Sequence, residues 1–299
     1  MENRLKHGER SFHTIVNISM MLLALIVLAP FLLLFMSSVS SEQSLIAHGY
    51  RFWPGEFSLD AYLYISRNTQ TIIRSYGLTV LTTVIGTGLG LTLTATLAYP
   101  LSRRDFSHRN VILFLVFFTM LFNGGLVPSY IMWTQFFGIR NTLAALIFPN
   151  LLLSAFNVIL VKNYYQHSIP EEICEAAEID GTGAWKTFSL IILPLSKPIF
   201  ATIGMFYMLA YWNSWVNGLY YISDSKLFSL QVLLNNILQN IQFLVSNSNK
   251  AGASANVASI PGVSIRMAIA VLGVLPVMVL FPFFQRYFVK GITMGAVKG

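Results

Sequence analysis

Six stretches of the chain are apolar over about the length of a membrane-spanning helix, which needs about 20 predominantly apolar residues. Polar or mixed segments separate these stretches. The pattern therefore predicts an all-α polytopic membrane protein with six transmembrane helices. The predicted spans are Thr14–Met36, Ile72–Tyr99, Val111–Trp133, Thr142–Val161, Ser189–Trp212 and Ile265–Tyr287.

The segments between the spans define the predicted domain organisation. The transmembrane domain covers residues 14–289, after an N-terminal segment at 1–13 and before a C-terminal tail at 290–299. Two segments predicted on the outer face, 37–71 and 213–264, are long. We expect neither of them to fold as a separate soluble domain.

Local patterns add four expectations. Leu59–Ile65 fits a short helix, and Phe228–Leu244 has the spacing of a helix lying on or in the outer face. The Ser-, Asn-, Gly- and Ala-rich stretch Ser246–Ser259 predicts a flexible loop. The apolar run Ile15–Met36 exceeds the 7–15 residues typical of a signal peptide, so we expect a retained helix rather than a cleaved leader.

Glycines in the second predicted span are spaced for close packing. Gly86 and Gly90 are four residues apart and so lie on one helix face. Small residues at that spacing allow two helices to approach closely. We expect ordinary helix packing here, either inside one chain or between subunits.

Composition supports the membrane class. The chain has 299 residues, of which 55% are hydrophobic and 10% are charged, against about 25% charged in soluble domains. The net charge of +7 does not indicate nucleic acid, because the positive charges flank apolar segments and form no basic aromatic surface.

The distribution of Lys and Arg predicts the orientation. With the N-terminus inside, twelve of the 19 Lys and Arg residues fall in inner segments, and Arg103 and Arg104 occupy one tight inner loop. Cytoplasmic loops carry such an excess. We therefore expect a multi-pass protein of the cell membrane with both termini in the cytoplasm, and a cytoplasmic position for the polar loop 162–188.

Several kinds of chemistry are missing from the sequence. No Asp or Glu lies inside a predicted span, which disfavours ion-driven transport, although backbone carbonyls alone can hold sodium. The chain has no Gly-x-x-x-x-Gly-Lys-Ser/Thr loop, no His-Glu-x-x-His motif and no Gly-x-Ser-x-Gly motif. We expect a non-enzymatic chain with no catalytic residue, metal site or cofactor of its own. Energy for uphill transport would come from another subunit.

The segment Ser168–Pro198 places five acidic residues between two apolar spans. Ser168 and Glu171 fit a capping box, and Gly181 after Asp180 fits a left-handed C-cap. The predicted helix has an apolar face with Ile169, Ile173, Ala176 and Ala177 and a polar side with Glu171, Glu175 and Glu178. Cys174 within it would act as a small apolar residue. We interpret the helix as inserting into a groove on a partner protein. The alternative, a helix lying on lipid, is disfavoured by glutamates at an anionic inner leaflet.

The motif Glu175-Ala176-Ala177-x-x-Asp180-Gly181, with Phe188, Ile191, Leu193-Pro194 and Pro198 after it, resembles the EAA loop of permease subunits of bacterial ABC importers. Residues 284–291 and 295–299 resemble the tail of carbohydrate permeases related to the maltose permease subunit MalG. The stretch Leu121–Tyr130 and the long last outer loop are similar to the LplC/YtcP-like branch. The resemblance covers essentially the whole chain.

The resemblance implies a type I ABC importer permease fold with a cytoplasmic coupling helix. Its implied partners are a homologous second permease subunit, two ATPase subunits that hold ATP and Mg, and an extracellular sugar-binding protein. The implied docking residues are Glu175, Ala176, Ala177, Asp180 and Gly181. The branch implies an oligosaccharide substrate. The rival function is a membrane scaffold or channel component without an ATPase partner.

Sugars bind to aromatic faces and to amide or hydroxyl groups in concave sites. The predicted substrate-pathway residues are Asn123, Tyr130, Asn157, Tyr211 and Asn213. Asn123 and Asn157 are favoured, because an amide inside a span is costly unless a neighbour or water satisfies it. The run Asn123-Gly124-Gly125 with Pro128 also predicts a break in the third span.

Overall fold

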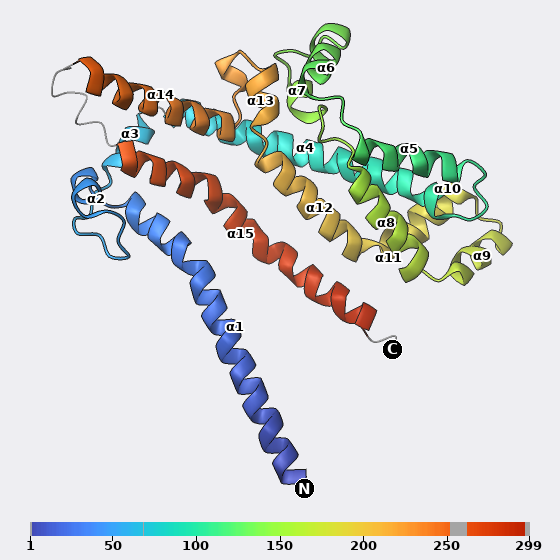
Figure 1. The fold of residues 1–299 in the computed structure, drawn as a ribbon. Helices are drawn as coiled ribbons and strands as arrows, with labels where there is room; N and C mark the ends of the chain where they lie inside the picture. The colour runs from blue at the N-terminus through green and yellow to red at the C-terminus, as the bar shows by residue number, and fades with distance from the viewer. Residues whose placement is uncertain (1, 68, 252–261, 297–299) are drawn as a thin grey trace. The chain divides into compact units, whose positions relative to one another are not determined.

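The computed structural model describes the backbone of residues 2–67, 69–251 and 262–296. Over these residues the regular structure is helical, with one isolated bridge between Ser40 and Phe57. Figure 1 shows the helices. In chain order, the α-helices are α1 (Glu2–Ser38), α2 (Glu42–His48), α3 (Asp60–Ser66), α4 (Thr69–Ser102), α5 (Arg109–Leu121), α6 (Leu126–Ile131), α7 (Leu143–Ile147), α8 (Ala155–Ser168), α9 (Glu171–Ile179), α10 (Ala184–Thr187), α11 (Leu193–Leu195), α12 (Lys197–Trp212), α13 (Val216–Tyr221), α14 (Leu230–Ala251) and α15 (Gly262–Ala296). Two π-helical turns, η1 (Met132–Phe136) and η2 (Phe188–Ile192), and one 3₁₀ turn, η3 (Ser225–Leu227), complete them.

Three helical segments in the described part are long and apolar enough to cross a membrane: Phe12–Ser38, Thr69–Ser102 and Gly262–Pro282. Two bent pairs raise this number to five if each pair crosses as one span. Arg109–Leu121 and Leu126–Phe136 meet at 114°, and Ala184–Leu195 and Lys197–Trp212 meet at 80°. The protein is thus an all-helical membrane protein with three to five candidate spans.

The prediction of one continuous helix over Thr142–Val161 is wrong. Helix α7 ends at Ile147, α8 begins at Ala155, and the residues between them are not helical. Asn150 lies there with φ 60°, a left-handed conformation that interrupts a helix. The predicted break in the third span is confirmed, because α5 ends at Leu121 and α6 begins at Leu126.

The chain forms two compact units, and the first combines residues 1–69 with 236–275. In this unit the Glu42 carboxylate accepts hydrogen bonds from the backbone N–H groups of Val263 and Ser264, each at 2.8 Å, and from Ser264 Oγ at 2.9 Å. The carboxylate therefore caps the start of α15, where the helix dipole favours negative charge. The short helix predicted near Leu59–Ile65 is confirmed as α3.

The expectation for the last long loop is partly wrong. Helix α14 continues to Ala251, whereas we expected a flexible loop from Ser246 onward. The remainder of that predicted loop, residues 252–259, lies outside the described residues. The segment does contain the expected helix over Phe228–Leu244, which begins two residues later than predicted, at Leu230.

The second unit contains residues 70–235 and 276–299, and its core includes side chains of α4, α8, α9 and α12. The glycine pair of α4 faces two tyrosines of α12. A Cβ at Gly86 would lie 2.3 Å from Tyr211 Cζ, and one at Gly90 would lie 2.9 Å from Tyr207 Cε1. The expected close helix approach is therefore confirmed, and it occurs inside one chain. Tyr207 also shares a hydrogen bond with Thr94 Oγ1 at 2.8 Å.

Candidate functional site

Helix α9 (Glu171–Ile179) forms where the sequence predicted a polar helix, but its N-terminus differs from the prediction. The N-cap is Pro170, which makes no side-chain capping bond, and Ser168 is the last residue of α8. The predicted capping box is therefore wrong, because Ser168 belongs to the preceding helix. Glu171 and Glu172 still occupy the first turn, where the helix dipole favours negative charge.

The C-terminus of α9 follows the prediction. Gly181 has φ +74°, the left-handed conformation that glycine adopts at low cost. The N–H of Thr182 donates to the carbonyl of Ala177 at 3.0 Å, and the N–H of Gly181 donates to that of Glu178 at 3.0 Å. This pair of bonds is a Schellman motif, which satisfies the last carbonyls of the helix. The helix therefore ends sharply at a defined residue.

The faces of α9 are arranged differently from the expectation. Ala177 is 4% exposed and Cys174 is 5% exposed, whereas Ala176 is on the exposed side. The four predicted apolar residues are thus divided between an inner and an outer face. Cys174 packs in the core of the unit as a small apolar residue, and burial raises the pKa of its thiol.

The outer face of α9 combines apolar and acidic side chains. Ile179 is 85% exposed, and Ile173 and Ala176 are also exposed. Glu172, Glu175 and Glu178 are exposed on the same short helix. The outer face therefore combines an exposed apolar strip with carboxylates, and a partner groove with an apolar floor and basic edges would match it.

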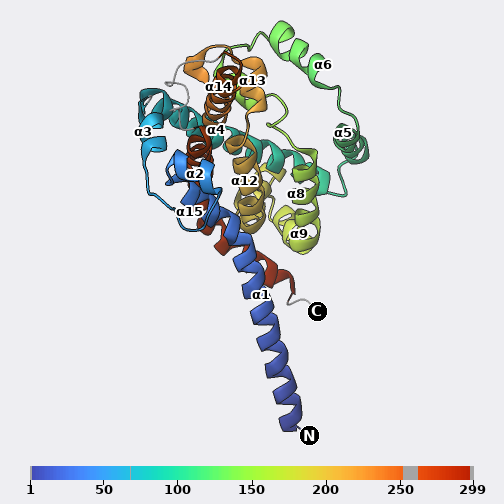
Figure 2. The same cartoon turned by 60° about the vertical axis from the view of Figure 1, so that its left-hand side comes forward.

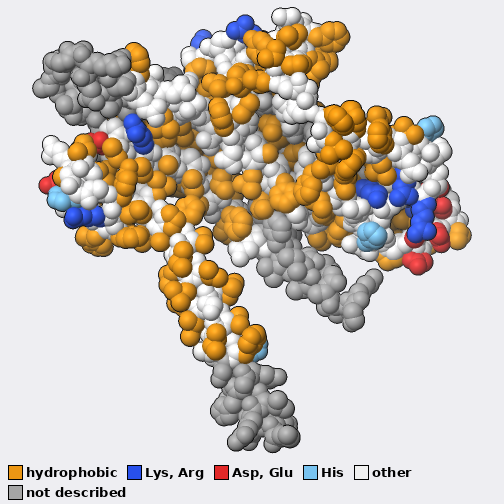
Figure 3. Space-filling view, in the orientation of Figure 1, with side chains coloured by type: hydrophobic (Ala, Val, Ile, Leu, Met, Phe, Trp, Pro, Cys, Tyr) orange, Lys and Arg blue, Asp and Glu red, His pale blue; other side chains and the backbone are white. Residues whose placement is uncertain are grey.

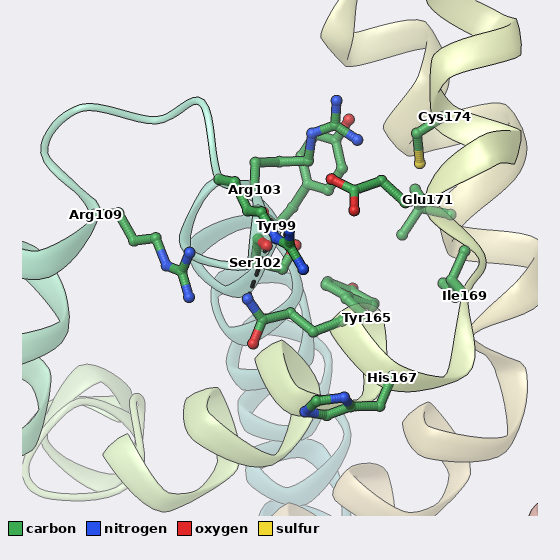
Figure 4. Close-up of a pocket in the computed structure, with 12 residues that line it drawn as sticks. Tyr99, Ser102, Arg103, Arg109, Tyr165, His167, Ile169, Glu171 and Cys174 are labelled. Atoms are coloured by element: carbon green, nitrogen blue, oxygen red, sulfur yellow. Dashed lines mark hydrogen bonds between the residues drawn. The ribbon is translucent and has the colours of Figure 1, made fainter.

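Contacts from the preceding helices hold α9 in position. The Arg103 guanidinium forms an ion pair with Glu178 of α9 and lies 3.5 Å from the Asp105 carboxylate. In α8, Gln166 Nε2 donates to the Ser102 carbonyl at 3.0 Å, which ties α8 to the end of α4 (Figure 4). Both ribbon views show α9 at the C-terminal end of α8 (Figures 1 and 2).

A short path connects α9 to α12. The chain passes through α10, η2 and α11, and bends by 80° around Ser196 before α12 begins at Lys197. Ser196 is fully buried and its Oγ donates to the Ile192 carbonyl at 2.6 Å. Phe188 and Ile192 lie in the same core cluster as Cys174. Side chains of α9, η2 and α12 therefore pack in one core cluster.

Three of the predicted pathway residues lie at or near the surface. Asn123 is exposed, and its Oδ1 accepts from the Gly125 N–H at 2.9 Å. Asn213 is also exposed, with Nδ2 donating to the Leu209 carbonyl at 2.9 Å. Tyr130 is partly buried and stacks on Tyr221 with ring centroids 5.8 Å apart.

The other two, Asn157 and Tyr211, are buried at 5% and 3% exposure. Tyr211 Oη donates to the Ile147 carbonyl at 3.0 Å, at the end of α7. Tyr207 Oη accepts from the Ser154 N–H at 3.2 Å, and Ser154 Oγ accepts from the Asn157 N–H at 3.5 Å. Tyr211 therefore holds the interruption between α7 and α8, and the five predicted pathway residues do not form one cluster.

The sequence pattern does not predict the roles of two residues that hold the interruption and α9 in place. Asn217 Nδ2 donates to the Pro149 carbonyl at 2.8 Å inside the interruption, and Asn217 is 3% exposed. Arg103, which the sequence identifies only as an orientation signal, also forms an ion pair with Glu178 of α9. The Asn217–Pro149 hydrogen bond joins residues 68 apart in the sequence, and the Arg103–Glu178 contact joins residues 75 apart, so no local sequence pattern predicts either of them.

Comparisons with known proteins identify the family of the chain. Residues 90–294 match the family described as "Binding-protein-dependent transport system inner membrane component". The protein LplC of Bacillus subtilis is 38% identical over 92% of this chain and 90% of its own length. The polygalacturonan/rhamnogalacturonan transport system permease protein YtcP of Bacillus subtilis is 36% identical over the full length of both chains. A solved structure, of a bacterial ABC transporter involved in the import of the acidic polysaccharide alginate, contains a chain with a TM-score of 0.77 and 26% identity, covering 94% of this chain and 98% of that one.

Proposed function

The chain belongs to the family of binding-protein-dependent transport system inner membrane components, and we propose that its helix α9 is the surface on which an ATPase subunit docks. The protein is a permease of a binding-protein-dependent ABC importer for carbohydrates, and it is a multi-pass protein of the inner membrane. It transports its substrate and is not itself an enzyme. A scaffold or channel without an ATPase partner does not fit this family.

One observation supports the docking proposal above the others. The outer face of α9 exposes Ile179 at 85% beside Ala176, while Cys174 on the inner face packs in the core of the unit. A rigid helix with an apolar and acidic outer face suits a groove with basic edges on a partner. Glu175 would supply charge, and Gly181 the sharp end that lets the groove close around the helix.

The docking surface is proposed to receive force from ATP hydrolysis. ATP and Mg would be held by two ATPase subunits and not by this chain. Each α9 would move with its ATPase, and the packed path through Phe188 and Ile192 would carry the motion to α12. This proposal places α9 and both termini in the cytoplasm, in agreement with the excess of Lys and Arg in those segments.

The family supports proposals for the remaining partners. We infer a homologous second permease subunit, an extracellular sugar-binding protein and six membrane crossings per chain. The sixth crossing would be built by α7 and α8 together, with the interruption between them. The substrate is proposed to be an oligosaccharide derived from a polysaccharide, because YtcP is named for polygalacturonan and rhamnogalacturonan. Its path is proposed to include Asn123, Tyr130, Asn157, Tyr211 and Asn213.

A charge introduced on the outer face of α9 tests the proposal. Ile179→Asp should leave membrane insertion and the size-exclusion profile unchanged, because Ile179 is 85% exposed. The variant should lose at least tenfold in co-purification with the ATPase and a similar factor in sugar uptake, because a carboxylate would be desolvated in an apolar groove. Both are measured with the full transporter expressed from its own subunits.

Ile46→Asp is the matched control. Ile46 is 71% exposed on α2, in the segment predicted on the other side of the membrane. This variant should retain ATPase association. If Ile179→Asp co-purified with the ATPase as well as the wild-type protein does, α9 would not be the docking surface.

A further inference from the structure

A cavity of about 240 Å³ lies on the inner side of α9, between that helix and the loop that joins α4 to α5 (Figure 4). Its lining combines basic groups, Arg103, Arg104, Arg109 and His167, with apolar side chains such as Ile169 and Ile192. Ile192 belongs to a segment that enters the membrane in one of the bent candidate spans. The cavity therefore lies at the junction of membrane helices and polar loops.

The positive charge of this cavity is largely uncompensated. Arg103 is occupied, because it pairs with Glu178 and approaches Asp105. Arg104 and Arg109 form no ion pair with any residue that the structure describes. Glu171 is the one acidic side chain among the described lining residues, and it forms no ion pair with them.

Arg109 carries the clearest sign of a missing partner. Its Nε atom is buried and has no hydrogen-bond partner. A buried charged donor without an acceptor costs more than a neutral one. The Arg109 side chain extends from the start of α5 toward the residues of the cavity (Figure 4). An anion in the cavity would accept from the terminal Nη groups of this guanidinium, and its charge would offset the cost of the buried Nε–H.

A further cation lies close to Arg109. Lys162 of α8 interacts electrostatically with Arg109, although it does not line the cavity itself. Lys162 also donates to Asn163 Oδ1 at 3.3 Å and has no carboxylate partner among the described residues. Figure 3 shows Lys and Arg side chains gathered on the surface beside the acidic ones at this end of the unit. The repulsion between these cations would be relieved by a bound negative charge.

We propose that this cavity binds the phosphate group of an anionic ligand, with Arg109 and Arg104 as its principal ligands. Guanidinium groups match phosphate in geometry, because their N–H donors bind two oxygens at once. A volume of about 240 Å³ is below the 300–1,000 Å³ typical of sites for drug-sized molecules, so it suits a head group better than a whole metabolite. Basic pockets between membrane helices are known to bind the head groups of anionic lipids. The same chemistry would hold soluble inorganic phosphate.

Binding measurements on the full-length, delipidated protein in detergent distinguish these sources. Native mass spectrometry is carried out with phosphatidylglycerol, with phosphatidylcholine and with inorganic phosphate. We expect retained phosphatidylglycerol, little phosphatidylcholine, and a roughly tenfold weaker occupancy in Arg109→Gln and in Arg104→Gln. Arg104 is exposed, so its variant keeps the test valid if Arg109→Gln folds poorly. Arg51→Gln, an exposed arginine outside the cavity, is the control and should bind as the wild type does.

Each possible outcome of these binding measurements either supports or overturns the proposed phosphate site. Arginine-dependent binding of inorganic phosphate without lipid would support the phosphate site and assign it to a soluble ligand. Equal binding by Arg109→Gln, Arg104→Gln and Arg51→Gln, or no binding of either phosphate source, would overturn the proposal. It would also be overturned if Arg109→Gln kept its lipid but lost the ATPase, since the cavity would then receive a protein side chain. That result is independent of the test on Ile179, because Ile179 does not line the cavity.

Discussion

The third and fourth predicted spans are both interrupted, and the two interruptions are built in opposite ways. The first, at residues 122–125, is exposed and is held by the Asn123 side chain bonding to the Gly125 N–H two residues away. The second, at residues 148–154, is held from outside by Tyr207, Tyr211 and Asn217, each of them buried. Backbone without helical hydrogen bonds is tolerated in a membrane protein only where other protein groups or water satisfy it.

The difference separates two roles for polar groups at such breaks. In the second interruption, each of the three side chains uses its polar atom on a backbone group, so those atoms serve the fold. In the first, the exposed backbone and the Asn123 amide remain open to another molecule. We therefore infer that the first interruption is the better candidate for contact with a sugar, and that the Tyr211 hydroxyl in the second mainly serves to hold the backbone.

The largest effect is expected where the second interruption depends on close packing. In Gly86→Ala the new methyl group would lie within 2.6 Å of three Tyr211 ring atoms, so the ring must move and release the Ile147 carbonyl. We expect a loss of about 3 kcal/mol in the free energy of unfolding, from overpacking together with a lost hydrogen bond. The measurement is thermal unfolding of the purified protein in detergent.

Gly88→Ala is the control for this prediction. Gly88 lies on the same helix, and a Cβ there meets no atom within 4 Å. This variant should be neutral or slightly stabilising, because alanine is the better helix former. Equal stability of the two alanine variants would show that α4 and α12 do not pack as described, and the comparison of the interruptions would lose its basis.

A smaller effect is expected from Asn217→Ala. The substitution removes the donor to the Pro149 carbonyl and leaves that buried oxygen unsatisfied, which should cost about 2 kcal/mol. Asn213→Ala removes a similar bond, to the Leu209 carbonyl, but at an exposed position, and should cost under about 0.5 kcal/mol. Unfolding midpoints of the two variants measure the contrast. If they were equally stable, the second interruption would not depend on the buried side chains that reach it.

The same contrast explains what could be predicted from sequence. The Asn123-Gly124-Gly125 run predicts its break because the residues that permit the turn are adjacent. The prediction of a continuous Thr142–Val161 rests on its apolar character and passes over Pro149 and Asn150, which are a local signal for a break. The side chains that hold the break open come from α12 and α13. Helix α9 shows both cases. Gly181 ends it as predicted by a local rule, whereas the packing of Cys174 and Ala177 against other elements buries one of the two alanines and divides the expected Ala176–Ala177 patch.

A small effect on stability, together with a large effect on uptake, is expected from Asn123→Ala. It removes one bond between exposed groups, while Gly125 keeps its φ of +84°, so the cost should be about 0.5 kcal/mol. Sugar uptake should nevertheless fall several-fold if the first interruption touches substrate, because the amide would be lost as a hydrogen-bond partner.

Tyr211→Phe should behave in the reverse way, losing about 1 kcal/mol of stability through its bond to Ile147 with a smaller change in the uptake KM. Unchanged uptake kinetics in Asn123→Ala would remove the first interruption from the sugar path, and a large KM change in Tyr211→Phe would show that the buried interruption also contacts the sugar.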